Sequence, residues 1–212
     1  MARKTKRSKK KSLRKVYSII VDGKCEQWYF QLMRKHENLS NIKIVPELPT
    51  KKKLKNLFNI VQEKIMEGYD KIIWLIDFDT LIKEERETPR GEKGKIQELK
   101  EYLSKLKQFK NIYVLVNSPC LEIWYLLHFE KSSKIYINCG SVITKLKRIE
   151  NLKDYKKSED YYKKENSDIY KKLKPYLNNA IENAKFLGNF DFKNVYAAKA
   201  EMYKIFELLK IS

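Results

Sequence analysis

The chain alternates between short apolar runs and longer stretches in which apolar side chains recur at helical spacing. Four runs are rich in β-branched residues and predict buried strands; they cover residues 16–21, 41–45, 71–76 and 111–116. The stretches between them predict helices over residues 26–35, 49–67, 95–106 and 119–129. Strands that alternate with helices indicate an α/β fold with a mostly parallel, doubly wound sheet of about four strands flanked by helices.

The pattern changes after Cys139, where only helical spacing continues. Candidate helices cover residues 140–152, 168–187 and 195–209, and a Tyr/Lys-rich stretch lies at 154–164. Residues 83–94 are charged and contain Pro89, Gly91 and Gly94, which predicts a mobile loop. We therefore expect a tail over 1–14, an α/β core over 15–135 and a helical C-terminal region over 136–212 packed on that core.

The charge of the chain is strongly positive and unevenly spread. The formal net charge is +19, and residues 1–15 contain nine Lys or Arg and no acidic residue. Such a tail is expected to be disordered until it meets a polyanion, and Lys9, Lys10 and Lys11 are candidate nucleic-acid contacts. A coding bias toward lysine, with a solvated basic surface, is the alternative explanation.

The three cysteines, Cys25, Cys120 and Cys139, are scattered and form no C-x-x-C motif. This spacing argues against a zinc ribbon and against a secreted disulfide scaffold. No apolar segment follows the basic N-terminus, and no apolar run is long enough to cross a bilayer. We therefore expect a cytoplasmic protein.

Polar side chains follow three of the predicted strands at the point where each strand ends. Asp22 and Glu26 follow the first strand, Asp77 and Asp79 the third, and Glu122 begins the helix after the fourth. Carboxyl ends of parallel strands meet at one edge of a sheet, where ligands bind. Because Mg²⁺ prefers oxygen ligands, Asp22, Asp77 and Asp79 are candidate ligands for Mg²⁺ or Mn²⁺.

Each of these residues also has a purely structural interpretation. Asp-x-Asp and Asp-Gly are common at loops and turns, and an acid such as Glu122 complements the dipole of a helix start. His128, between Leu127 and Phe129, fits either a catalytic or a core position. Cys25 at a helix start has no histidine nearby to activate it as a nucleophile.

Three blocks of the chain resemble RloB-like proteins. They are VDGKCEQWYF (21–30), WLIDFDT (74–80) and NSPCLEIWYLLHFE (117–130), and the later segments DYKKSEDYY and AIENAKFL are also similar. The likeness covers about residues 15–210. Two departures stand in the first block, where Asp22 replaces a glutamate and Cys25 a threonine.

The resemblance implies a Toprim-like domain that uses Mg²⁺ for phosphodiester chemistry. By position, Asp22, Glu26, Asp77, Asp79, Glu122 and His128 would be the catalytic set, with the metal on Asp22, Asp77 and Asp79. It also implies a role in restriction and abortive-infection loci of bacteria, where an ABC-type ATPase commonly stands nearby. Lys24, beside Asp22, is a candidate phosphate contact.

Three functions are consistent with this sequence. The first is a metal-dependent nuclease acting on DNA or RNA in antiviral defence. The second is a non-catalytic module that binds nucleic acid or an ATPase, with a vestigial acidic site; the shorter side chain of Asp22 favours it. The third is a small-molecule phosphohydrolase or nucleotide-transfer enzyme, although neither G-x-G-x-x-G nor G-x-x-x-x-G-K-[ST] occurs.

Overall fold

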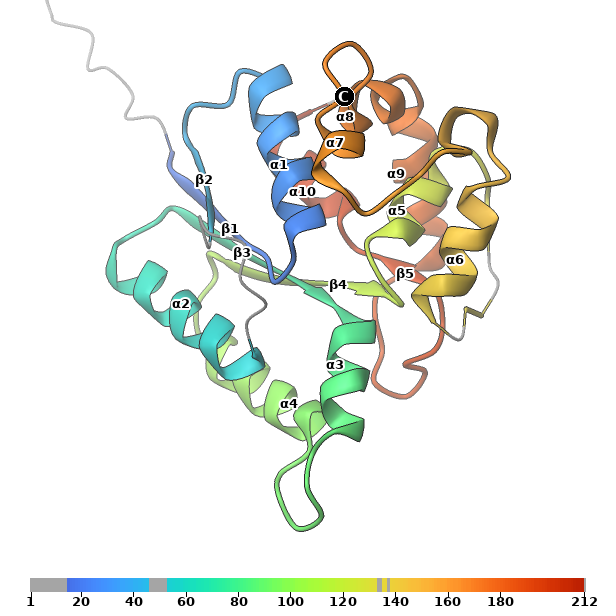
Figure 1. The fold of residues 1–212 in the computed structure, drawn as a ribbon. Coiled ribbons are helices and arrows are strands. Elements are labelled where there is room, and N and C mark those ends of the chain that lie inside the picture. The colour runs from blue at the N-terminus through green and yellow to red at the C-terminus, as the bar shows by residue number, and fades with distance from the viewer. Residues whose placement is uncertain (1–14, 46–52, 133–134, 137, 212) are drawn as a thin grey trace, which may run out of the picture.

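A five-stranded sheet forms the centre of the molecule (Figure 1). The computed structural model describes residues 15–45, 53–132, 135–136 and 138–211. The strand order is β2-β1-β3-β4-β5, in which the first four strands are parallel and β5 is antiparallel to β4. The strands are β1 (Tyr17–Ile20), β2 (Ile42–Val45), β3 (Lys71–Asp77), β4 (Ile112–Ser118) and β5 (Lys199–Ala200). The predicted α/β class is confirmed, with one strand more than expected.

Helices cover both faces of this sheet. Figure 1 shows α2, α3 and α4 on one side and α1, α5, α9 and α10 on the other. The helices are α1 (Lys24–His36), α2 (Leu54–Met66), α3 (Phe78–Arg86), α4 (Lys95–Leu106), α5 (Glu122–Leu127), α6 (Cys139–Leu146), α7 (Glu159–Tyr162), α8 (Ile169–Leu173), α9 (Leu177–Leu187) and α10 (Tyr203–Leu209), with 3-10 turns at Glu150–Leu152 and Lys174–Tyr176.

Two apolar clusters explain why the strands have continuous apolar runs. Ile19 and Ile73 face the cluster on the α1 side, whereas Ile20 and Trp74 face the cluster on the α2 side. Successive side chains of a strand point to opposite faces, so a sheet covered on both faces needs apolar residues at nearly every position.

Within 138–211, the C-terminal region contacts the core but is not helical throughout. The rings of Trp124 and Phe206 stack at 5.3 Å, which joins α5 to α10. The expectation of helices alone after Cys139 was wrong, because β5 pairs Asn117 with Ala200 and Ser118 with Lys199. A two-residue strand depends on its partner and has too few positions to show a periodic pattern.

Several predicted boundaries also differ from the structure. Helix α3 extends into the predicted loop 83–94 as far as Arg86, because Phe78 and Leu81 bury one side of it while Lys83 and Arg86 are exposed on the other. Pro119 does not open a helix; α5 begins at Glu122. The predicted helix 168–187 is interrupted at the turn that contains Pro175, since proline cannot donate the helical hydrogen bond.

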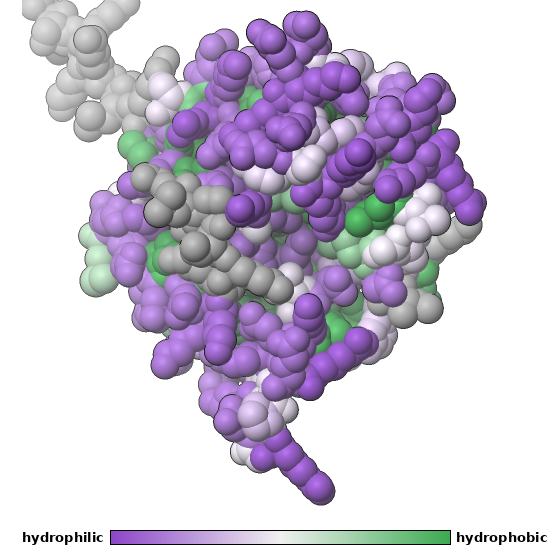
Figure 2. Space-filling model, viewed as in Figure 1, coloured by the Kyte–Doolittle hydropathy of each residue, from purple (hydrophilic) through white to green (hydrophobic). Residues whose placement is uncertain are grey.

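The surface of the molecule is largely hydrophilic on the face shown in Figure 2. No helix within the described ranges is both long and apolar enough to cross a membrane. The predicted tail over 1–14, with Lys9, Lys10 and Lys11, lies outside the described residues, as does the start of the predicted helix 49–67.

Candidate functional site

The strand register brings the predicted acidic residues to one edge of the sheet. Strands β1, β3 and β4 are neighbours, Asp77 lies opposite Asn117, and Asp22 follows directly after β1 and Val21. A cavity of about 170 Å³ opens at this edge, and its lining includes Asp22, Glu26 and Asp77. The structure therefore brings together three of the carboxylates that the sequence predicts at the carboxyl edge.

Asp77 is positioned by the junction between β3 and α3. It is the N-terminal capping residue of α3, yet its side chain makes no capping hydrogen bond. Its Oδ1 atom is buried and has no hydrogen-bond partner in the part of the chain that the structure describes. The side chain of this aspartate therefore does not act as a helix cap, and its Oδ1 atom remains available to a ligand.

Glu26 lies in the first turn of α1 and is only 5% exposed. Its carboxyl group is hydrogen-bonded to Asp77 and to its own backbone N–H. The side chain folds back over Gly23, where a Cβ atom would collide with Glu26 Oε2. Glycine at position 23 thus makes room for the carboxylate that reaches Asp77.

The carboxyl groups of the site raise one another's pKa. Burial raises the pKa of Asp77, and the charges of Glu26, Asp22 and Glu122 raise it further. Burial and the charge of Glu122 also raise the pKa of Glu26. Lys157 opposes both shifts, but the net shift in each pKa remains upward.

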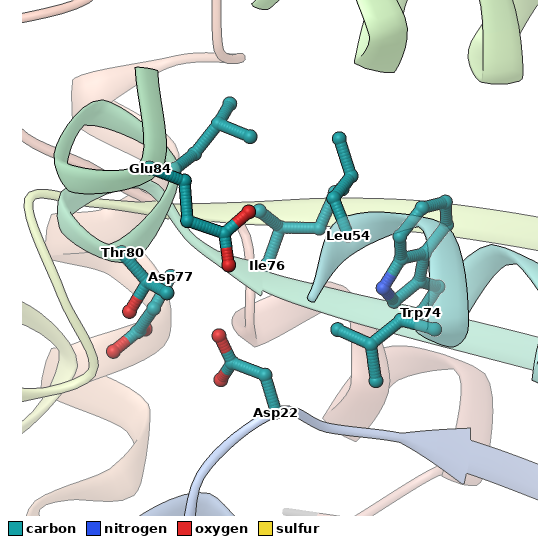
Figure 3. A pocket seen from close by; sticks show the side chains of 9 residues that line it. Asp22, Leu54, Trp74, Ile76, Asp77, Thr80 and Glu84 are labelled. Carbon is teal, nitrogen blue, oxygen red and sulfur yellow. The ribbon is translucent and has the colours of Figure 1, made fainter. Parts of the chain in front are cut away.

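A second, smaller cavity of about 20 Å³ adjoins the first on the α3 side. Figure 3 shows the carboxylates of Asp22 and Glu84 pointing toward one another, with Asp77 and Thr80 beside them. Glu84 Oε2 is buried without a hydrogen-bond partner among the described residues. Sequence reasoning missed Glu84, because that segment was predicted to be a loop.

Glu122 joins the acidic edge from the α5 side and is completely buried. Its Oε1 atom accepts a hydrogen bond from the Tyr155 hydroxyl at 2.5 Å and lies 2.8 Å from Lys157 Nζ. The Tyr155 and Tyr162 hydroxyls are 2.8 Å apart. Sequence reasoning assigned no role to Tyr155 or Lys157, although the Tyr/Lys-rich composition of 154–164 and its likeness to the RloB-like segment were signals.

Asp79 is directed elsewhere. It lines a separate cavity of about 10 Å³ with Pro119 and Tyr196, and its backbone N–H donates to the Pro119 carbonyl at 2.7 Å. Helix α3 already begins at Phe78, and residues two apart on a helix point in nearly opposite directions. The two aspartates of the Asp-x-Asp motif therefore line different cavities at this edge of the sheet.

His128 belongs to the core. It is completely buried, its Nδ1 atom is bonded to the Trp124 carbonyl at 2.8 Å, and burial lowers its pKa to about 4. It lines neither of the two cavities that contain Asp22. These contacts favour the core interpretation of this residue.

Cys25 lines the larger cavity, but burial and the charge of Glu26 raise its pKa to about 12. A thiol with this pKa is protonated at neutral pH, which disfavours a nucleophilic role.

Cys120 and Cys139 form a disulfide, whereas the spacing of the cysteines in the sequence predicted no pairing between them. The pair is separated by 19 positions along the chain, and α5, which follows Cys120, contacts α6, which begins at Cys139. Within the described ranges, the three side chains with ligand atoms all within 4.8 Å are Cys120, Glu122 and Cys139. Because both sulfurs are in the disulfide, this trio does not support Mg²⁺ binding.

The carboxylates at the sheet edge are the type of ligand that a hard divalent cation prefers. They supply only oxygen atoms, Asp77 Oδ1 has no partner among the described residues, and a cation would relieve the repulsion that raises the pKa of Asp77. Among the described residues, however, no three of these carboxylates have ligand atoms all within 4.8 Å of one another. The suitability for Mg²⁺, which retains several waters and takes few protein ligands, therefore rests on the oxygen chemistry and not on a preassembled cage.

Comparison with known proteins gives a family but no characterised relative. No curated protein and no solved structure matches the chain. The family model described as RloB-like protein matches residues 17–209, which include all the residues of the acidic edge. The chain therefore belongs to the RloB-like family.

Proposed function

We propose that the protein is a Mg²⁺- or Mn²⁺-dependent nuclease that cleaves phosphodiester bonds of DNA or RNA. The observation that carries this proposal is the buried Glu26–Asp77 carboxyl pair, which meets Asp22 and Glu122 at the carboxyl edge of a parallel sheet. Buried acids with raised pKa values beside a cavity are typical of functional sites.

The residues of the site divide the chemistry among themselves. Asp22 and Asp77 would hold the cation, and its binding would release to solvent the proton that Glu26 and Asp77 share in their hydrogen bond. The Glu26 carboxylate would then accept a proton from the attacking water. When bound, the divalent ion polarises the phosphoryl oxygen and lowers the pKa of water. Lys24, which lines the same cavity, offers its ammonium group to the nucleic-acid backbone.

The biological setting of this proposal is antiviral defence in a bacterial cytoplasm. Its support is the membership of the RloB-like family and the net charge of +19, which suits a polyanionic substrate. The basic tail with Lys9, Lys10 and Lys11 would hold the nucleic acid, and an ABC-type ATPase would act as partner.

The test is a cleavage assay on DNA, RNA and tRNA with Mg²⁺ or Mn²⁺ and with EDTA. We expect metal-dependent cleavage that disappears in the variant carrying both Asp77→Ala and Asp79→Ala. Cleavage that persists in this variant would contradict the assignment.

A non-catalytic module is favoured by one observation, the aspartate at position 22, whose carboxylate extends one methylene less than a glutamate. Titration with Mg²⁺ and Mn²⁺ separates the two functions. A protein that retains nucleic-acid binding but binds neither ion would be such a module.

A further inference from the structure

We propose that Lys157 forms a phosphate-binding subsite beside the acidic edge, where its ammonium group binds a non-bridging oxygen of the nucleic-acid backbone. This inference rests on the proposed function and assigns a substrate contact to a residue outside the three family blocks, in the similar segment DYKKSEDYY. Lys157 follows the turn at Glu150–Leu152 and reaches the sheet edge from the C-terminal region.

The position of Lys157 combines a buried anchor with an accessible end. Its Nζ atom lies 2.8 Å from Glu122 Oε1, and Glu122 is completely buried. The lysine side chain itself is 44% exposed, and it lines the cavity of about 170 Å³ together with Asp22 and Asp77. The ammonium group is thus fixed on one side and open to the cavity on the other.

The hydrogen-bonding capacity of the ammonium group leaves room for a ligand. It carries three N–H donors, of which one points to Glu122, while Cys139 Sγ lies 3.4 Å from Nζ. A sulfur is a weak acceptor, whereas a phosphate oxygen is a strong one. A phosphate in the cavity would therefore gain a charge-assisted hydrogen bond without breaking the ion pair with Glu122.

The negative charge of the acidic edge favours a positively charged side chain beside the bound phosphate. A phosphodiester that approaches Asp22, Glu26 and Asp77 is repelled by their negative charge. Without Lys157, a single metal ion would have to neutralise both these carboxylates and the phosphate. Lys157 lines the same cavity as Asp22 and Asp77, so its positive charge lies beside the reacting centre. Burial lowers the pKa of Lys157, but the charges around it, that of Glu122 foremost, raise it, and the net shift is upward, so Lys157 is charged at neutral pH.

The test measures the binding of inorganic phosphate by calorimetry in the presence of EDTA, where no cleavage can occur. Relative to the wild-type chain, Lys157→Met should weaken phosphate binding by about tenfold or more, the loss expected for a charge-assisted hydrogen bond. The matched control is Lys156→Met, since Lys156 is the exposed neighbour on the same segment and should bind as the wild type does.

A second pair of variants guards against misfolding, because Lys157→Met leaves Glu122 buried without its counterion. Glu122→Gln alone should bind phosphate at least as tightly as the wild type, since it removes a competing anion. Adding Lys157→Met to Glu122→Gln should abolish that binding. Equal affinity in these two variants, or no phosphate binding in any variant, overturns the subsite.

The result is independent of the outcome for the nuclease itself. Phosphate binding that depends on Lys157, in a protein that cleaves nothing, would keep the subsite and reject the nuclease. Metal-dependent cleavage with an unchanged KM in Lys157→Met would keep the nuclease and reject the subsite.

Discussion

Acidic residues occur in two settings in this molecule, and they behave in opposite ways. On the helix surfaces they pair with lysines: Lys93 donates to Glu101 and lowers its pKa, and Lys95 with Tyr102 lowers the pKa of Glu98 against the effect of burial. At the sheet edge, burial and neighbouring acids raise the pKa of Glu26 and Asp77.

This difference shows where the protein keeps acidic residues at a cost to its folding stability. Surface pairs are common in a chain with 34% charged residues, and each contributes little. A buried excess of carboxylates destabilises the fold unless a ligand neutralises it, so its presence at one edge points to function rather than to solubility. The following changes either break this contrast or sharpen it.

The largest effect is expected from removing one charge at the edge. Asp77→Asn should reduce metal-dependent cleavage by about 10³-fold or more, because Asp77 contacts Glu26 and faces the cavity. Asp79→Asn should reduce it much less, since Asp79 lines a different cavity. Single-turnover cleavage rates compare the two, and equal losses would show that both aspartates serve one ion.

A smaller loss is expected when Glu26 is displaced rather than removed. Gly23→Ala keeps an allowed backbone, since φ is −119°, but its Cβ collides with the Glu26 carboxylate. We expect a reduction of about 10–100-fold in the cleavage rate, as for a misplaced catalytic group.

The matched control is Gly94→Ala, whose Cβ would lie 2.5 Å from Glu85 Oε1 at a distance from the cavities that contain Asp22. It should leave cleavage unchanged. A loss in both variants would point to general damage rather than to the position of Glu26.

The pH dependence of stability should also differ between the two settings. A carboxyl group with a raised pKa in the folded state binds its proton more tightly there. Its contribution is therefore full below the ordinary values, 4.5 for Glu26 and 3.8 for Asp77, and is lost as the pH rises through the raised values. In EDTA, Asp77→Asn should flatten this decline.

At pH 8 without metal, Asp77→Asn should raise the melting temperature by about 2–4 °C, the shift that corresponds to about 1 kcal/mol in a chain of this length. Added Mg²⁺ should stabilise the wild type and not the variant. Thermal melts from pH 4 to pH 8 measure both effects, and a variant as steep as the wild type would argue against a strained acidic edge.

The smallest effect is expected at the surface. Glu101→Gln removes the exposed pair with Lys93 and should change the melting temperature by no more than about 1 °C. A shift as large as that of Asp77→Asn would remove the contrast between the two settings.

The sequence was sufficient for the parallel sheet and for most of the acidic edge. Asp22, Glu26 and Asp77 could be placed together because the residues after neighbouring parallel strands share one edge. The alternation of strands and helices predicts parallel strands but not their order, so the shared edge depended on β1, β3 and β4 being neighbours, which the structure shows. The antiparallel β5 left no signal of its own.

Other parts of the site could not be predicted from local patterns. Tyr155 and Lys157 reach the edge only through tertiary packing, and the pairing of Cys120 with Cys139 depends on α6 lying beside α5. The divergence of Asp79 from Asp77 follows from where α3 begins, and helix boundaries are the least certain feature of a sequence pattern.

The tyrosine hydroxyls beside Glu122 form a row with a fixed polarity. Each tyrosine has one O–H proton, and that of Tyr155 goes to Glu122. Tyr162 must then donate to Tyr155, and Tyr125, 3.3 Å away, must donate to Tyr162. All three hydroxyl dipoles therefore turn their positive ends toward one carboxylate, so a phenylalanine even at the far end of the row would alter the electric field at Glu122.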